Sequence, residues 1–339
     1  MSLQVKYAII TNKGLVRSIN EDIINAGTVH KVDTSGAPIR MNYMMVCDGM
    51  GGMKAGETAS RLAATTVMDY INAMPFWPTL EDDIKDQLIG TLIAAHQNIK
   101  MLAKYDFDKN GMGTTIVLMI IVKNRAYITW SGDSRAYILT NQPNFAVGMD
   151  VKGLRLLTKD HSASWGMVEK GLLTIDQVRN HPQSNALTQS LGGEHPPTPD
   201  FISFEVSNTD RLLVCTDGVY LHIETSELRD VLKDYKNPDQ GISVIQDIIL
   251  SRGAKDNFSL GIVDIIDAQW SDPLLTAAGA PSVNDSQKSH TWYYFVGFGI
   301  ICLLFWWLWN KGIFQNTSSI LNKKVPFNYY NPDVTVDYA

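Results

Sequence analysis

The chain has 339 residues, of which 45% are hydrophobic and 19% are charged, a composition typical of a globular protein with a substantial core. Its net charge of -6 and its lack of Lys/Arg clusters interleaved with aromatic residues argue against nucleic-acid binding. The cysteines Cys47, Cys215 and Cys302 are far apart, so they indicate neither a disulfide framework nor a zinc site and suit a reducing cytosol. None is followed six positions later by an arginine, so the cysteine-nucleophile pattern of tyrosine phosphatases is absent.

The first polar cluster contains an arginine and two adjacent carboxylates, Arg17, Glu21 and Asp22. Taken alone, it is explained well by a salt bridge on a solvated loop. The cluster indicates a functional site only if carboxylates from distant parts of the chain lie beside it.

The short apolar run at residues 43–47 predicts a buried strand that ends on Asp48 and continues into a glycine-rich turn. A carboxylate buried there must be compensated, and a bound cation is the usual compensation. Gly49 has no side chain to keep a metal away from its own carbonyl oxygen, and Gly51 and Gly52 permit a tight turn. An ordinary strand exit with an exposed Asp48 remains an alternative for this segment alone.

Two helices are expected next. Residues 55–74 are rich in Ala and end before Pro75, and Thr79 is expected to cap a second helix. His96 lies within that second helix and is interpreted as a structural residue. The apolar face of the helix is expected to consist of Ile84, Leu88, Leu92, Ala95, Ile99 and Leu102.

The following segment predicts a hairpin and then an insertion. The β-branched run at residues 116–122 and the run at residues 126–130 are typical of two paired strands. The second strand runs into Asp133, next to a glycine at a strand boundary. After another strand-like piece, residues 163–192 are expected to form a helical, lid-like insertion.

From residue 211 the pattern of the first strand recurs, because the apolar strand at residues 211–216 ends on Asp217. Helices are expected at residues 225–234, capped by Thr225, and at residues 237–251. Asp256 then precedes a last strand at residues 259–266.

The C-terminal part has a different composition. Residues 268–291 are small and polar without periodicity, which predicts a flexible linker. Residues 292–309 carry no charge over about 18 positions, with Trp and Tyr at both ends, which predicts a transmembrane helix within residues 292–313. A buried core helix is the alternative. A short tail, residues 314–339, completes the chain.

The orientation of this span follows from two opposing signals. The start of the chain lacks the apolar core of a secretory signal, so the folded domain at residues 1–267 is expected to stay in the cytoplasm. Lys311, Lys323 and Lys324 follow the span whereas only Lys288 closely precedes it, and this count would place the tail in the cytoplasm instead. We expect a single-pass membrane protein with a cytoplasmic folded domain.

Taken together, the carboxylates describe an all-oxygen site. Such a site suits Mg²⁺ or Mn²⁺, and no His-x-x-x-His or paired Cys competes for a softer metal. The candidates are Glu21, Asp22, Asp48, Asp133, Asp217 and Asp256.

The order and spacing of eight motifs over residues 5–267 resemble the bacterial form of the metal-dependent serine/threonine protein phosphatases of type 2C. The motifs are Arg17-x-x-Asn20-Glu21-Asp22, Asp48-Gly49-Met50-Gly51-Gly52, Gly113-Thr114-Thr115, Gly132-Asp133-Ser134-Arg135-Ala136-Tyr137, Leu157-Thr158-x-Asp160-His161-Ser162, Leu187-Thr188-x-Ser190-Leu191-Gly192, Thr216-Asp217-Gly218 and Asp256-Asn257.

This resemblance implies an α+β fold, a four-layer αββα sandwich of two antiparallel sheets flanked by helices. To it the sequence adds one C-terminal transmembrane helix. The resemblance also implies that Asp48 bridges two metal ions and that the Gly49 carbonyl binds one of them. Asp217 and Asp256 would complete the coordination of the other ion.

The remaining roles are implied in the same way. Glu21 and Asp22 would hold the second metal largely through its waters, and Asp133 matches the ligand of a weaker third metal in bacterial members. Two Mn²⁺ or Mg²⁺ ions would lower the pKa of a bridging water, which would attack phosphorus in line without a covalent enzyme intermediate. Arg17 would bind two phosphate oxygens and offset charge in the transition state. The expected substrates are phosphorylated proteins, and the expected partner is a Ser/Thr kinase.

Two positions depart from the resemblance. Many eukaryotic relatives have a histidine, a proposed proton donor, where this chain has Met50, so a metal-bound water is the expected donor. Gln189 stands where relatives often have arginine.

A catalytically inactive member that binds phosphoproteins or senses a ligand would be marked by loss of a carboxylate. A small-molecule phosphatase would be favoured if residues 163–192 walled off the cleft.

Overall fold

The computed structural model describes residues 4–51, 55–178, 181 and 186–267. The chain divides into two units, Met1–Ala277 and Ala278–Ala339, and all described residues lie in the first. The predicted linker, membrane span and tail, residues 268–339, therefore lie outside the described residues, and the proposed domain boundaries stay predictions. None of the described helices has the length and apolar content that crossing a bilayer requires.

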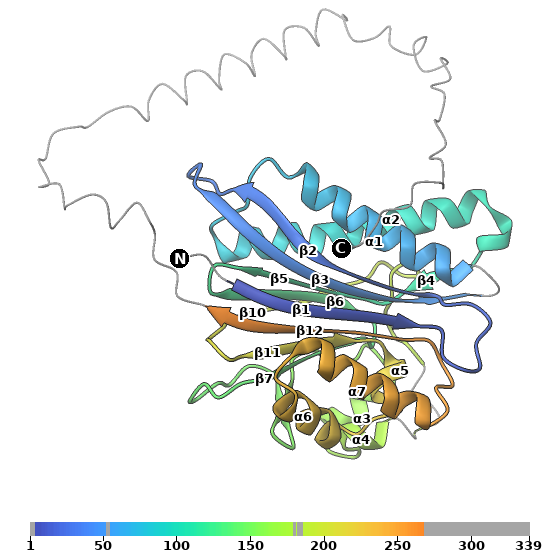
Figure 1. Cartoon of the computed structure of the whole chain (residues 1–339). Helices are drawn as coiled ribbons and strands as arrows, with labels where there is room; N and C mark the ends of the chain where they lie inside the picture. Colours follow the sequence, from blue (N-terminus) through green and yellow to red (C-terminus); the bar gives the residue numbers. More distant parts are fainter. Residues whose placement is uncertain (1–3, 52–54, 179–180, 182–185, 268–339) are drawn as a thin grey trace, which may run out of the picture. The chain divides into compact units, whose positions relative to one another are not determined.

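Two antiparallel six-stranded sheets form the centre of the described unit (Figure 1). The first sheet contains, in spatial order, β1 (Gln4–Asn12), β12 (Phe258–Asp267), β11 (Arg211–Cys215), β7 (Arg135–Leu139), β9 (Leu154–Leu156) and β8 (Met149–Val151). The second contains β10 (Asp200–Glu205), β6 (Arg125–Ser131), β5 (Ile116–Val122), β3 (Pro38–Met50) and β2 (Asp22–Val32), with β4 (Gly113–Thr114) paired to the end of β3.

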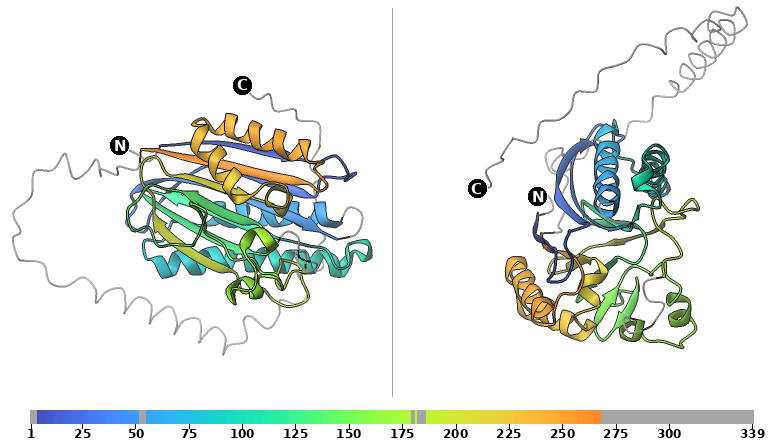
Figure 2. Two further views of the ribbon diagram at one scale, coloured as in Figure 1. Left: turned by 90° about the horizontal axis from the view of Figure 1, so that it is seen from below. Right: turned by 90° about the vertical axis from the view of Figure 1, so that its right-hand side faces the viewer.

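Helices cover the outer face of each sheet (Figure 2). The second sheet is covered by α1 (Ala55–Ala73) and α2 (Glu81–Tyr105), followed by the short helix η1 (Phe107–Lys109). The first sheet is covered by α3 (Trp165–Glu169), α4 (Ile175–Val178), α5 (Asp217–Tyr220), α6 (Thr225–Asp234) and α7 (Pro238–Ser251). The predicted α+β sandwich of two antiparallel sheets flanked by helices is confirmed.

Strand β3 shows why the sequence specifies these layers. Met45 and Cys47 pack in the core between the second sheet and its helices, whereas Met44 and Val46 pack in the core between the two sheets. Alternate residues of a strand point to opposite faces, so a strand buried on both faces is apolar at every position. The continuous apolar run in the sequence therefore marks a central strand, although β3 extends beyond it to 13 residues.

The caps predicted for two helices are wrong. Leu80 precedes α2 and makes no side-chain cap, while the Thr79 hydroxyl lies 3.0 Å from that of Thr34. Glu224 is the N-cap residue of α6, and the Thr225 hydroxyl donates to Asp176 at 2.9 Å. In both cases a tertiary contact occupies the hydroxyl that local sequence would assign to the cap.

Other local predictions are confirmed. Pro238 lies in the first turn of α7, and the hairpin of β5 and β6 turns at Lys123, whose φ is 54°. His96 is 7% exposed and its Nδ1 accepts from the backbone N–H of Gly192 at 3.1 Å, a structural contact. The described part of the expected insertion contains only the two short helices α3 and α4.

Arg211 provides a test of what holds the first sheet to its helices. Its guanidinium pairs with both carboxylate oxygens of Asp264, at 2.5 and 2.7 Å, and donates to the carbonyls of Leu232 in the last turn of α6 and of Tyr235 and Lys236 just after it. We expect Arg211→Met to lower the free energy of unfolding by about 3 kcal/mol, because it leaves a largely buried carboxylate unpaired. Chemical denaturation measures this loss.

Arg61→Met is the matched control for that substitution. Arg61 pairs with Glu57 one turn away on α1, but its side chain is 64% exposed. Its removal should change the free energy of unfolding by about 0.5 kcal/mol. Equal losses in the two variants would contradict the structural role of Arg211.

Candidate functional site

The ends of strands from both sheets meet at one end of the described unit. The register of β2 and β3 pairs Asp22 directly with Asp48. Asp217 is the first residue of α5, immediately after β11. The Thr216 hydroxyl donates to Asp22 at 2.9 Å and so links the first sheet to the second at this end. The fold therefore brings Asp22 and Asp48, from the second sheet, to the same end of the unit as Asp217, which follows a strand of the first sheet.

A cavity of about 240 Å³ lies at this meeting point. Every predicted site residue except Asp22 lines it, and Asp22 is 3% exposed. The lining comprises Arg17, Glu21, Asp48, Gly49, Met50, Gly51, Thr115, Asp133, Leu187, Asp217, Asp256 and Asn257.

Three carboxylates in and beside the cavity, Asp22, Asp48 and Asp217, have raised pKa values. The pKa of Asp22 is raised to about 7, mainly by burial and also by the charges of Asp217 and Asp256, against hydrogen bonds that lower it. Burial raises the pKa of Asp217 to about 6, with a further contribution from Asp256. Burial, followed by the charges of Asp22 and Asp217, holds the pKa of Asp48 well above its usual range. Such a cluster favours a bound cation.

Two buried oxygens indicate where positive charge fits. Glu21 Oε1 and Asp22 Oδ1 have no hydrogen-bond partner. Over the described ranges, no three Asp, Glu, His or Cys side chains are close enough to form a complete protein cage for a metal ion. Mg²⁺ and related hard cations need only one or two carboxylates because they keep several waters, so the donors of this cavity suit such ions.

Gly49 is required by close backbone packing. A Cβ atom at Gly49 would lie 2.2 Å from the carbonyl oxygen of Gly56 at the start of α1, and 2.6 Å from that of Glu21. The Gly49 N–H donates to that same Glu21 carbonyl at 3.2 Å. The sequence interpretation concerned metal access at Gly49, and the structure adds a steric reason for the glycine.

Arg17 lies on the loop between β1 and β2, at the edge of the cavity. Its side chain is 49% exposed, and its Nη2 lies 2.6 Å from Asp256 Oδ2. That contact is the largest cause of the raised pKa of Arg17. The predicted phosphate-binding arginine thus has one side toward the carboxylates and the other toward solvent.

The threonines after the predicted Gly113 motif position Asp48. The backbone N–H of Thr115 and the hydroxyl of Thr114 both donate to the Asp48 carbonyl, at 2.9 Å each. The Thr115 hydroxyl in turn accepts from the Asp48 N–H at 3.1 Å. This explains why two threonines follow the glycine, a role that the sequence analysis did not assign.

A buried ion pair lies behind Asp133. Arg135 and Asp160 have side chains 2% and 1% exposed, and two hydrogen bonds of 2.9 and 2.7 Å join them. The guanidinium stacks 3.7 Å from the ring centroid of Tyr220, whose hydroxyl donates to the Asp133 carbonyl at 3.1 Å. Sequence reasoning missed this pair, although both residues stand in the quoted motifs, because nothing in sequence links positions 25 apart.

Gln189 has a local role in place of the arginine found in relatives. Its side-chain oxygen accepts from the backbone N–H and the hydroxyl of Thr198, at 2.8 and 2.9 Å. Its nitrogen lies 2.9 Å from His161 Nδ1, which also accepts from the Gly132 N–H at 3.1 Å. The side chain thus joins its own loop to the turn before Asp133.

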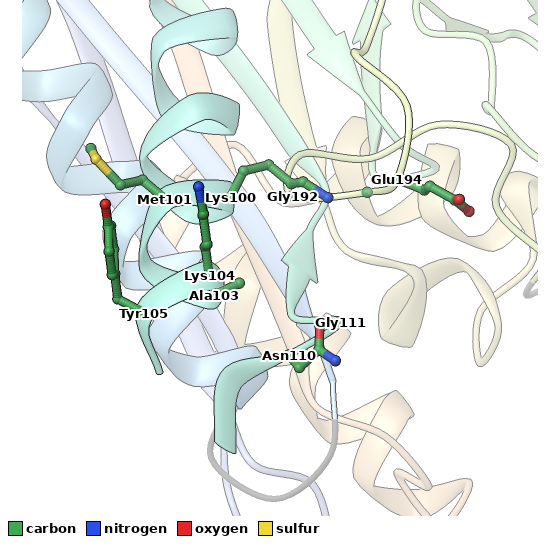
Figure 3. A pocket seen from close by; sticks show the side chains of 10 residues that line it. Lys100, Met101, Ala103, Lys104, Tyr105, Asn110, Gly111, Gly192 and Glu194 are labelled. Atoms are coloured by element: carbon green, nitrogen blue, oxygen red, sulfur yellow. The ribbon is translucent and has the colours of Figure 1, made fainter. Parts of the chain in front are cut away.

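A larger cavity, of about 780 Å³, lies beside the end of α2 (Figure 3). Its charged lining residues are Lys100, Lys104 and the single carboxylate Glu194. One carboxylate beside two lysines cannot form a site for divalent cations. This cavity is therefore not assigned as the active site, although it is larger than the carboxylate-lined cavity. The smaller, carboxylate-lined cavity is the candidate active site.

Comparisons with known proteins agree with this assignment. The family model "Protein phosphatase 2C" matches residues 11–165. The "Serine/threonine phosphatase stp" of Listeria welshimeri is 32% identical over 254 residues, which cover 75% of this chain and 93% of that protein. "Serine/threonine protein phosphatase PstP" of Mycobacterium tuberculosis is 27% identical over 287 residues, covering 85% of this chain and 50% of that protein.

Solved structures show the same fold. The Streptococcus agalactiae serine/threonine phosphatase superposes with a TM-score of 0.65 at 28% identity, covering 77% of this chain and all of that one. The catalytic domain of PstP, solved in complex with two manganese ions, superposes with a TM-score of 0.63 at 25% identity, covering 78% of this chain and all of that one. Since a relative 32% identical is matched over nearly its whole length and the fold agrees, this chain belongs to the protein phosphatase 2C family of metal-dependent serine/threonine phosphatases.

Proposed function

We propose that this chain hydrolyses phosphoserine and phosphothreonine in proteins with Mn²⁺ or Mg²⁺ held in the carboxylate-lined cavity. The observation that carries the proposal is the convergence of carboxylates from five separate segments on one cavity, with an arginine at its edge. Hard divalent cations prefer such all-oxygen sites, and phosphoryl transfer needs positive charge around the phosphate. The carboxylates are Glu21, Asp48, Asp133, Asp217 and Asp256.

The proposed roles follow the positions of the side chains. Asp48 would contact two cations, with the Gly49 carbonyl on one of them, and Asp217 and Asp256 would bind the other. Divalent cations bound there would lower the pKa of a coordinated water so that it can attack phosphorus. A third, weaker site would use Asp133. Glu21 and Asp22 would act through waters, which suits the buried, partnerless oxygen that each presents.

Arg17 is the residue proposed to bind the phosphate. Its planar guanidinium can donate to two phosphate oxygens at once, and its contact with Asp256 orients it beside the cavity. Met50 lines the cavity at the position where many eukaryotic relatives have a histidine that is a proposed proton donor. A thioether has no proton to give. The leaving alkoxide is therefore proposed to take its proton from water.

The inactive alternative and the small-molecule alternative have less support. The proposed carboxylates are all present, and those expected to bind metal directly line one cavity, so nothing marks a lost ligand. The described part of the insertion contributes only Leu187 to the lining, and Arg17 stays half exposed. A phosphorylated residue on a protein can therefore approach the edge of the cavity.

We further propose that residues 292–313 anchor the protein in a membrane and that residues 1–267 lie in the cytoplasm. The support for the anchor is the uncharged segment with aromatic residues at both ends. In this location the enzyme would reverse the action of a Ser/Thr kinase on phosphorylated proteins.

The metal-site assignment predicts the effect of Asp217→Asn. Residues 1–267 should hydrolyse a phosphothreonine peptide with Mn²⁺, and the substitution should lower kcat/KM about 100-fold because a charged ligand is lost. The matched control is Asp69→Asn, at an exposed position of α1, which should keep the original rate. An unchanged rate in Asp217→Asn would show that the assigned metal site is wrong.

The raised pKa values predict how cations affect stability. The folded protein keeps protons on Asp22 to about pH 7 and on Asp217 to about pH 6, whereas the unfolded chain releases them near pH 4. When a chelator has removed divalent cations, the free energy of unfolding should therefore fall as the pH rises from about 4 to about 7. Added Mn²⁺ should restore the lost free energy of unfolding.

Thermal denaturation with EDTA or with Mn²⁺ across this pH range tests the prediction. Asp22→Asn should make the fall in EDTA shallower, because the amide carries no titrating proton. The site would be contradicted by a melting temperature that Mn²⁺ leaves unchanged at pH 7.5.

The proposed topology predicts that a C-terminal tag is accessible from outside the cell. In intact spheroplasts, added protease should remove the tag from the full chain while residues 1–267 remain protected. A tag that survives until the membrane is permeabilised would show that the tail lies in the cytoplasm. A full chain found in the soluble fraction would contradict the proposed membrane anchor.

A further inference from the structure

Two consecutive apolar side chains lie exposed directly before the phosphate-binding arginine. Leu15 is 65% exposed and Val16 is 68% exposed, on the loop between β1 and β2 that also carries Arg17. Single exposed apolar residues are common on protein surfaces and need no explanation. What distinguishes this pair is that it directly precedes Arg17, which lines the carboxylate-lined cavity.

The loop that carries the pair is held at both ends. Asn257 Nδ2 donates to the carbonyls of Lys13 and Ile19, at 2.9 Å each, while its Oδ1 accepts from the Glu21 N–H at 2.9 Å. One side chain beside the cavity therefore fixes the start of the loop, its end and the adjoining carboxylate residue. The exposed pair is held in register with the site.

The centre of the loop is fixed as well. The Leu15 N–H donates to the Ala254 carbonyl at 2.9 Å. Gly14 has a φ of +74°, and a Cβ there would lie 2.3 Å from the Asp256 carbonyl oxygen, so the loop backbone lies directly on the segment before β12. A loop whose backbone is already fixed loses little conformational entropy when its side chains bind a ligand.

We propose that Leu15 and Val16, here called the Leu15–Val16 surface, bind an apolar side chain of the phosphoprotein substrate close to the phosphorylated residue. This inference rests on the proposed function and adds a preference for substrate sequence to it. Consecutive Cα atoms are about 3.8 Å apart, and an extended peptide advances about 3.3 to 3.6 Å per residue. With the phosphate on Arg17, the surface therefore meets a substrate residue within about three positions of the phosphorylated one.

The test uses phosphothreonine peptides with Ser, Gly and Ala around the phosphorylated residue and one Leu moved from three positions before it to three after it. For the full chain in detergent with Mn²⁺, Leu at one or two of these positions should raise kcat/KM about fivefold to tenfold, mainly through KM. Rates are divided by those for p-nitrophenyl phosphate, which has no flanking residues, so that differences in folding or metal content cancel. The double variant Leu15→Ser/Val16→Ser should lose the gain.

Leu80→Ser is the matched control. Leu80 is 67% exposed and follows Trp77, which bridges to Asp33 at the turn between β2 and β3, the end of β3 opposite to Asp48 (Figure 1). Serine is a favoured residue at the helix N-cap position that Leu80 occupies, so this variant should fold and keep the gain.

The outcomes separate this inference from the proposed function. If the original chain hydrolyses the peptides but Leu gives no gain at any position, or if the double variant keeps the gain, the Leu15–Val16 surface is not a substrate site and the phosphatase proposal stands. If the chain hydrolyses p-nitrophenyl phosphate but none of the phosphopeptides, the proposed function itself fails, and the inference fails with it.

Discussion

Repulsion between buried carboxylates is the constraint on which the site depends. Asp22 and Asp48 face each other across neighbouring strands, and Asp217 reaches the same place from the other sheet. Burial raises the pKa of each of them, so without a cation the folded chain keeps protons on these groups that water would remove. The threonine hydrogen bonds to Asp48 and the contact of Thr216 with Asp22 hold these groups in place.

Asn257 connects the parts of the site that differ in function. Its amide can donate and accept at the same time, which an aspartate at this position could not do. It fixes the loop that carries Arg17 and also the backbone at Glu21, so a single side chain connects the arginine of the cavity to one of its carboxylate residues. Gln189 similarly joins its own loop to the turn before Asp133, through a side-chain amide at a position where relatives often have arginine.

The apolar strands and the carboxylates at their ends could be predicted because they leave local signals, whereas the arrangement of the sheets in layers was implied by the family resemblance. Residues 43–47 of strand β3 form a continuous apolar run since both faces of the strand are buried there, and Asp48 follows that run. The caps at Thr79 and Thr225 were wrong because distant partners take their hydroxyl groups. The contacts of Asn257 with residues more than 230 positions away leave no local pattern at all. The individual metal-binding roles remain predictions.

The alternation along β3 has a consequence for the charges in the cavity. Asp48 shares a face with Met44 and Val46, so a shift of one residue against β2 or β5 would turn the carboxylate toward α1 and α2. Met45 would then fill the space between the sheets almost as well as Met44 does. A molecule shifted in this way would lack the Asp48 carboxylate in the cavity, so the register of β3 also decides which charges the cavity contains.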